Sequence, residues 1–273
     1  MSAGKLQLER ILDERCTCRV GRRIEIHDTV DSTNELAWER VANGDSDGLV
    51  IFAEHQQSGR GRLGRSWDSP RGASVLMSLV LHDPEGDLGS EILSLLAAVA
   101  ATDAVDAASA VTVEIKWPND LTVNGRKLGG ILIESRSGRR QGTSPGMQAP
   151  TVYVVGTGIN CLQHRRHFTS ELRDTATSLD LESALPVDRN RVARHLLIEL
   201  DRWLAAPRRW DRGELKDAWV RRALPLGRRI RLRQAGAEFI GQVLDVDPAA
   251  GLLVQLDTGG RNWFDAASTS MAD

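Results

Sequence analysis

The stretch "GLVIFAEHQQSGRGRLGRSWDSPRGASVLMSLVLH", Gly48 to His82, sets two apolar runs on either side of a segment of glycine and arginine. Each run has the length and the apolar composition of a buried strand, whereas the segment between them has no periodicity. We therefore predict two strands of one sheet, at 48–55 and 73–82, joined by a long surface loop. Glycine lets a loop backbone approach a ligand closely, and arginine offers a fork of donors that fits carboxylate or phosphate oxygens.

A mixed β-sheet with flanking helices, an α+β fold, is predicted for most of the chain. Further strands are expected at 22–28, 111–117, 127–135 and 151–160, with a short strand that ends at the hairpin signal Asn124-Gly125. Helical spacing of apolar residues predicts helices at 6–14, 31–44, 92–108, 188–206 and 208–222. Either Ser32 or Thr33 is placed to cap the helix at 31–44.

The pattern changes near Pro225, where short alternating segments separated by turn residues begin. They lie at 228–234, 237–247, 251–257 and 261–265, and such spacing is typical of a small antiparallel barrel. We predict a main domain at 1–224 and a small barrel domain at 225–273. The segment 136–150 is rich in Gly, Ser, Pro, Arg and Gln and is predicted to be an exposed, mobile loop.

The composition limits what the chain can bind. Its 273 residues are 41% hydrophobic and carry a net charge of -2 at pH 7, so there is no surplus charge with which to attract nucleic acid or an acidic membrane. The three cysteines are too few for a disulfide framework, and no secretory signal is seen, which together indicate a cytoplasmic protein. The apolar segment from Ile92 is interrupted by Asp103 and Asp106, so it predicts a buried helix and not a membrane span.

The glycine-arginine loop alone leaves its ligand open. Arg62-Leu63 stands where a phosphate-binding P-loop has Gly-Lys-Ser/Thr, which disfavours that motif. A flexible binder of single-stranded nucleic acid normally has a longer repeated segment and surplus basic charge. A solvated surface loop without a ligand stays open at this point.

Four motifs elsewhere narrow the choice, because together with the loop they resemble biotin protein ligases in order and approximate spacing. The resemblance extends from about Asp28 to Asp265 and is carried by "DSTN" from Asp31, "EHQQSGRGRLGRSW" from Glu54, "KWPNDL" from Lys116, "RKLGGILIE" from Arg126 and "VVGTGIN" from Val154. It implies a class II synthetase-like catalytic domain at 1–224 and an SH3-like barrel at 225–273. It further implies two-step acyl transfer, in which biotin and ATP give biotinyl-5′-AMP and a lysine of a biotin carboxyl carrier protein takes the biotinyl group. Biotin, ATP and Mg²⁺ are the implied small molecules.

The resemblance also assigns roles to residues. Those implied to bind biotin are Ser32, Thr33, Asn34, Gln56, Gly59, Arg60, Gly61, Arg62, Trp67, Lys127 and Gly130. Those implied to bind the nucleotide are Arg60, Arg62, Trp67, Asn119, Lys127, Gly156, Gly158 and Asn160. Arg62, Lys127 and Asp120 are implied to be catalytic, with Arg62 retaining the adenylate, Lys127 reaching the biotin carboxylate and α-phosphate, and Asp120 handling charge or a proton near the acceptor lysine.

Asn119, Asp120 and Asn160 are expected to serve the nucleotide and its Mg²⁺, since hard oxygen ligands suit that ion. Within the loop, Arg60 and Arg62 are expected to face the ligand, and Arg65 is expected only to support the loop.

Several features depart from the family pattern or leave alternatives. After "GIN", Phe168 is the one aromatic residue nearby, so the partner of adenine stays open. His164 and His167 lack companion ligands, which favours a basic turn over a zinc site. The segment before the first predicted strand is too short for the winged helix of repressor-type relatives, so we expect a monofunctional ligase that does not bind DNA, and a homodimer is possible. The alternatives are a lipoate-type ligase and a non-catalytic regulator that binds biotinyl-AMP.

Overall fold

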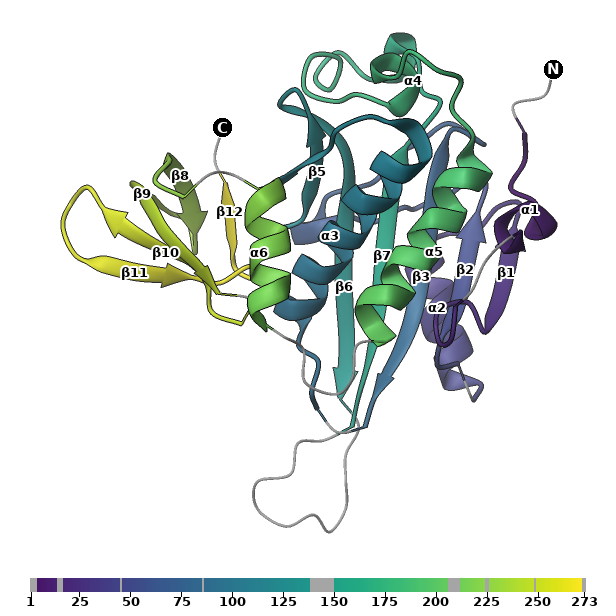
Figure 1. Ribbon diagram of the computed structural model, residues 1–273, viewed down its shortest axis with the longest axis horizontal. Coiled ribbons are helices and arrows are strands. Elements are labelled where there is room, and N and C mark those ends of the chain that lie inside the picture. The colour runs from purple at the N-terminus through teal and green to yellow at the C-terminus, as the bar shows by residue number, and fades with distance from the viewer. Residues whose placement is uncertain are drawn as a thin grey trace.

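A seven-stranded mixed sheet forms the centre of the molecule (Figure 1). The computed structural model describes residues 4–13, 17–44, 46–84, 86–137, 150–205, 212–223, 226–247 and 249–271. The strands lie in the order β1-β2-β3-β7-β6-β5-β4, and β1 and β2 are parallel whereas the other neighbours are antiparallel. Their bounds are β1 Arg23–His27, β2 Leu49–Ala53, β3 Ser74–Asp83, β4 Glu114–Lys116, β5 Asp120–Val123, β6 Arg126–Ser137 and β7 Thr151–Asn160.

Helices cover the two faces of this sheet unequally. α3 (Ser90–Ser109), α5 (Arg189–Ala205) and α6 (Arg212–Arg222) lie in front of the sheet in Figure 1, whereas α2 (Thr33–Ala42) lies behind it. Two short helices, α1 (Leu8–Leu12) and α4 (Leu179–Glu182), lie near the sheet's periphery, and single 3₁₀ turns occur at Arg62–Gly64 and Arg165–His167. The face that carries α2 therefore leaves room for loops over β3, β7 and β6.

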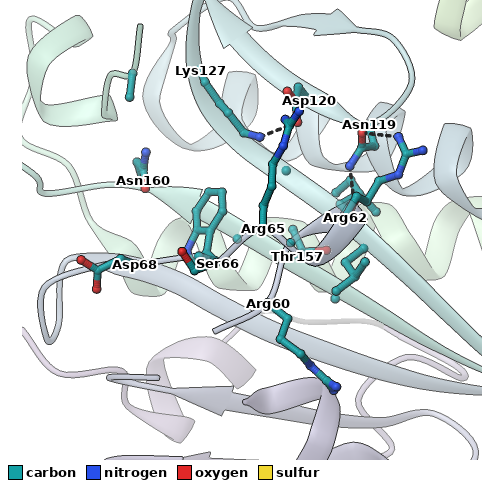
Figure 2. Close-up of a pocket in the computed structure, with 18 of the residues that line it drawn as sticks. Arg60, Arg62, Arg65, Ser66, Asp68, Asn119, Asp120, Lys127, Thr157 and Asn160 are labelled. Atoms are coloured by element: carbon teal, nitrogen blue, oxygen red, sulfur yellow. Dashed lines mark hydrogen bonds and ion pairs between the residues drawn. The ribbon is translucent and has the colours of Figure 1, made fainter. Parts of the chain in front are cut away.

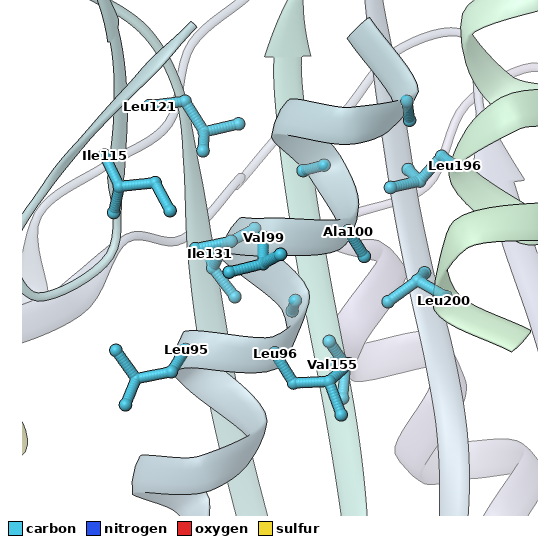
Figure 3. Packing of buried hydrophobic residues seen from close by; sticks show 14 of the residues in the cluster. Leu95, Leu96, Val99, Ala100, Ile115, Leu121, Ile131, Val155, Leu196 and Leu200 are labelled. Carbon is cyan, nitrogen blue, oxygen red and sulfur yellow. The ribbon is translucent and has the colours of Figure 1, made fainter. Parts of the chain in front are cut away.

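The main core forms between α3 and the sheet. Leu95, Leu96 and Val99 of α3 lie over Ile131 of β6 and Val155 of β7 (Figure 3), and all five side chains are buried. Burial of each such side chain contributes about 1.5–3 kcal/mol, so this layer is a large part of what fixes the helix on the sheet. By length and hydropathy α3 could cross a membrane, but here it is a core helix, as its interrupted apolar sequence predicts.

A second, five-stranded antiparallel sheet follows, in the order β11-β10-β9-β8-β12. Its strands are β8 Arg229–Gln234, β9 Ala237–Asp247, β10 Gly251–Leu256, β11 Arg261–Phe264 and β12 Thr269–Met271. The fold class expected from the sequence, a mixed sheet with flanking helices and a small C-terminal barrel, is confirmed. The division at 224/225 stays a prediction, since both residues lie outside the described ranges.

Most predicted elements are present, with shifted ends. The predicted helix at 92–108 is α3, and those at 188–206 and 208–222 are α5 and α6. Strand β12 was not predicted, because "TSM" has no apolar alternation and is held by pairing with β8. Most of the loop expected at 136–150 lies outside the described residues.

Candidate active site

A cavity of about 470 Å³ opens beside α2, and segments far apart in sequence line it. They are the start of α2, the loop between β2 and β3, strands β5 to β7, the segment after β7, and the last barrel strand, β12. The barrel contributes Ser270 and Met271, so the wall of the cavity is completed by the C-terminal domain. The volume lies in the range of small-molecule sites.

Gln56 lines this cavity and caps α2. Its Oε1 accepts hydrogen bonds from the Thr33 backbone N–H at 2.8 Å and from the Thr33 hydroxyl at 3.0 Å. That N–H belongs to the first helical turn and has no partner within the helix. Ser32 occupies the N-cap position, one of the two predicted, but its side chain makes no capping bond, because the carboxamide of Gln56 accepts from the first turn instead. Ser32 instead lines the cavity.

The glycine-arginine segment folds into a small hairpin over the cavity. Trp67 N donates to Gly59 O at 2.8 Å, and Gly61 N donates to Arg65 O at 2.7 Å. A Cβ on Gly59 would lie 2.3 Å from Trp67 O, so the close approach of these two backbone segments requires glycine there. The hairpin therefore holds the arginines at fixed points along the cavity rim.

Arg62 bridges the hairpin, the main sheet and the barrel. Its guanidinium donates to Asn119 Oδ1 at 2.9 Å, to Ala267 O at 3.2 Å and also to the carbonyl of Ala266 (Figure 2 shows the bond to Asn119). Burial lowers the pKa of Arg62, and the nearby charge of Asp120 opposes that shift. The arginine stays protonated, since its unperturbed pKa is so high.

The directions of the Arg60 and Arg65 side chains are the reverse of those expected from the sequence. Arg65 lines the cavity and reaches toward Asp120, whereas Arg60 points away from it (Figure 2). The Arg60 guanidinium lies 3.5 Å from Glu134 Oε1 and is 44% exposed, although the residue still contributes to the cavity wall. The expectation that Arg65 only supports the loop is wrong in this structure.

Lys127 faces the cavity because of a β-bulge in β6. Asp120 pairs with Gly130 and Leu121 with Gly129, but Thr122 pairs with Lys127, so Leu128 is the extra residue. The bulge moves Lys127 onto the face that Gly130 and Asp120 share, which an unbroken period of two would not do. Its ammonium lies 2.6 Å from Asp120 Oδ1 (Figure 2).

Trp67 packs closely against the backbone of β7 at Gly158. A Cβ on Gly158 would lie 2.8 Å from two ring carbons of Trp67, so glycine is what lets the indole lie there. The Lys127 ammonium lies 5.9 Å from the ring centroid, within range of a cation–π contact. The Trp67 Nε1 atom is buried and makes no hydrogen bond to the described residues.

Comparison with known proteins agrees with this geometry. The profile of the Biotin/lipoate A/B protein ligase family matches residues 26–144. The bifunctional ligase/repressor BirA of Bacillus subtilis is 32% identical over 263 residues, which cover 96% of this chain and 78% of that protein. The biotin--[acetyl-CoA-carboxylase] ligase of Mycobacterium tuberculosis is 36% identical over 249 residues, covering 88% of this chain and 85% of that protein.

The chain belongs to the biotin protein ligase family. A biotin protein ligase from Aquifex aeolicus, solved in complex with biotin and ATP, shares the fold with a TM-score of 0.69. It is 23% identical and covers 92% of this chain and 99% of that one. The family resemblance inferred from the five motifs is thereby confirmed.

The cavity of this biotin protein ligase gathers nearly all the residues that the motifs singled out. Members of the biotin, nucleotide and catalytic sets line it, namely Ser32, Thr33, Asn34, Gln56, Arg60, Gly61, Arg62, Trp67, Asn119, Asp120, Lys127, Gly130, Gly156, Gly158 and Asn160. Gly59 is the exception, because it is buried within the hairpin against the backbone of Trp67. Their roles toward biotin and the nucleotide remain predictions.

Fewer side-chain oxygen atoms are available to coordinate Mg²⁺ than the sequence predicts. Asn119 Oδ1 accepts from the Arg62 guanidinium, whose positive charge disfavours a metal ion there. Asn160 Oδ1 accepts from Gln163 at 2.8 Å and from the Ser74 hydroxyl at 3.5 Å, so both of its lone pairs are engaged. Asp120 remains as a hard oxygen donor. No cluster of three or more His, Cys, Asp or Glu that could hold a metal occurs in the described ranges. These residues fit an ion held mainly by substrate phosphates and water, with at most one carboxylate from the chain.

Several cavity residues could not be identified from the sequence. Ser270 and Met271 come from the unpredicted strand β12, and Leu172 comes from an irregular segment next to Phe168, which also lines the cavity. Ser78 lies behind it, with its hydroxyl 2.8 Å from Thr33 Oγ1. A serine in the middle of the apolar run at 73–82 is the one signal that pointed to this position.

Proposed function

We propose that the chain joins biotin to ATP to form biotinyl-5′-AMP and pyrophosphate, and then transfers the biotinyl group to a lysine of a biotin carboxyl carrier protein. The observation that carries this is one cavity with cations at one part of its wall and neutral polar groups at another. Arg62, Arg65 and Lys127 supply the cations. The hydroxyl of Ser32 and the amide of Gln56 suit a neutral ureido ring, which needs both donors and acceptors.

The first step brings two anions together. An oxygen of the biotin carboxylate attacks the α-phosphorus of ATP, the bond to the bridging oxygen breaks, and pyrophosphate leaves with the electron pair. Fixed cations that face the phosphorus centre lower the repulsion and stabilise the charge that builds up there. Lys127 suits this position, because its compact ammonium can contact the carboxylate and the phosphate in turn.

The second step transfers the acyl group to nitrogen. The acceptor amine attacks the acyl carbon of the mixed anhydride, AMP leaves, and the nitrogen loses a proton. Asp120, whose Oδ1 is 2.6 Å from Lys127 Nζ, supplies a carboxylate beside the reacting groups and is the proposed proton-handling residue. The hairpin and Trp67 would shield the anhydride from water, which otherwise hydrolyses it.

The same proposal names the protein that accepts the biotinyl group and the ion that accompanies ATP. We propose a carrier domain of a carboxylase as acceptor, since relatives carry the name biotin--[acetyl-CoA-carboxylase] ligase. Magnesium would enter with ATP and neutralise its phosphates. Dimer formation, a cytoplasmic location and the lack of DNA binding remain predictions from the sequence.

The test is biotin-dependent release of pyrophosphate from ATP, followed by mass spectrometry of a carrier domain. We expect pyrophosphate only with biotin and a biotinyl adduct on one lysine. Turnover with lipoate and not with biotin would instead indicate a lipoate-type ligase. Tight retention of biotinyl-AMP without transfer to any carrier domain would indicate a regulator.

A further inference from the structure

A buried hydrogen-bond network lies directly behind the cavity wall at Asn160, with Gln163 at its centre. Gln163 is 1% exposed and does not line the cavity. Its Nε2 lies 2.6 Å from Ser74 Oγ, 2.8 Å from Asn160 Oδ1 and 3.3 Å from Ser69 Oγ. The network thus joins the start of β3, the end of β7 and the end of the glycine-arginine loop.

The direction of these hydrogen bonds is fixed by one backbone carbonyl. Asn160 Nδ2 donates to Thr177 O at 3.0 Å, and a carbonyl can only accept. Asn160 Oδ1 must therefore face Gln163, and the Gln163 amide must present its NH₂ group to that oxygen. Neither amide can be rotated by 180° without placing two acceptors or two donors together.

Asn160 is left with one polar group for a ligand. Its oxygen accepts from Gln163 Nε2 and, at 3.5 Å, from the Ser74 hydroxyl, and one N–H is used by Thr177, so the second N–H of the amide is what it can offer to the cavity. Gln163 itself is held in place, since the Ser178 hydroxyl donates to Gln163 O at 2.6 Å. The Gln163 Oε1 atom is buried without a partner in the described part of the chain, a cost that stability alone does not explain.

We propose that Gln163 is a positioning residue that turns Asn160 into a hydrogen-bond donor for an acceptor atom of the nucleotide. This inference rests on the proposed adenylation of biotin. Through Ser69 the same amide also ties the end of the loop that follows Trp67 to the nucleotide side of the cavity. Gln163 is thus a determinant of ATP affinity although it touches no ligand.

The test is the kinetics of Gln163→Met in the full chain, followed as biotin-dependent pyrophosphate release. Loss of one oriented hydrogen bond predicts a KM for ATP about three- to tenfold higher. The KM for biotin should stay within about twofold, because the network does not reach Gln56 or Thr33. Gln163→Glu, which keeps the shape but puts an acceptor against Asn160 Oδ1, should raise the KM for ATP at least as much and serves if Gln163→Met does not fold.

A double-mutant cycle separates positioning from simple destabilisation. In an Asn160→Ala background, Gln163→Met should cause no further rise in the KM for ATP, since the residue acts through Asn160. Thr102→Val removes another fully buried hydrogen bond, from Thr102 Oγ1 to Val99 O, and should lower the melting temperature without changing either KM.

Three results would overturn the proposal: an unchanged KM for ATP in a folded Gln163 variant, an equal rise in both KM values, or full additivity with Asn160→Ala. Failure of the wild-type chain to release pyrophosphate with biotin would instead refute the proposed function.

Discussion

Substitution of Lys127 by glutamine tests the proposed chemistry most sharply among single changes. The ammonium lies 2.6 Å from Asp120 Oδ1, and the two side chains are 39% and 26% exposed. An ion pair this accessible contributes only about 0–1 kcal/mol to folding, so the melting temperature should hardly change. A preorganised charge aimed at a reacting phosphate is worth far more, and its loss should lower biotin-dependent pyrophosphate release about 10²–10³-fold.

The chain offers a matched control. Lys216 Nζ lies 2.6 Å from Asp245 Oδ1, with side chains 34% and 42% exposed, and neither residue lines the cavity. Lys216→Gln should therefore match Lys127→Gln in stability and retain wild-type adenylation. If Lys127→Gln stays within about threefold of wild type while folded, the lysine is only half of a surface ion pair and the reasoning fails.

Three further changes probe other parts of the account. Arg62→Gly should release biotinyl-AMP from the enzyme faster and label bystander proteins, measured by mass spectrometry; unchanged retention would contradict the predicted role of Arg62 in holding the adenylate. Gly158→Ala puts a methyl group 2.8 Å from Trp67, so it should weaken biotinyl-AMP binding at least about tenfold by calorimetry; unchanged affinity would contradict the need for glycine beside the indole. Asp47→Asn should destabilise the fold at pH 7 by about 1–2 kcal/mol. Burial raises the pKa of the Asp47 carboxyl, but the hydrogen bonds from Arg19 outweigh burial, so the pKa in the folded state lies below its usual value of 3.8. The difference in unfolding free energy between the wild type and Asp47→Asn should be full above pH 3.8 and be lost as the pH falls below 3.8 through the lower pKa of the folded state. A difference that persists in acid would show that the charge of Asp47 is not the cause.

The fold was largely predictable because its elements carry local signals. The run that became β2 is apolar throughout, the run that became β3 is mostly apolar, and α3 has an apolar sequence of helical length. Strand β12 carries no such signal, since its three residues are held by pairing with β8. Its place in the cavity wall depends on how the barrel packs, which no local pattern encodes.

The sequence predicts which residues gather at the site, but it does not predict which of their side chains face the cavity. The motifs bring Arg60, Arg62 and Arg65 to one loop, but which guanidinium faces the cavity depends on the hairpin pairing and on Glu134. Lys127 faces the cavity through a bulge that a period-two reading of β6 would miss. Long-range hydrogen bonds such as the one from Gln163 to Asn160 depend on tertiary structure alone.

Direct transfer of biotin to a carrier is the measurement that tests the central claim. The purified chain would be incubated with biotin and ATP, freed of small molecules, and mixed with a biotin carboxyl carrier domain. The account predicts one biotinyl group on one lysine of the carrier by mass spectrometry, and no adduct when ATP or biotin is withheld from the first incubation. An unmodified carrier in the presence of enzyme-bound biotinyl-AMP would contradict it.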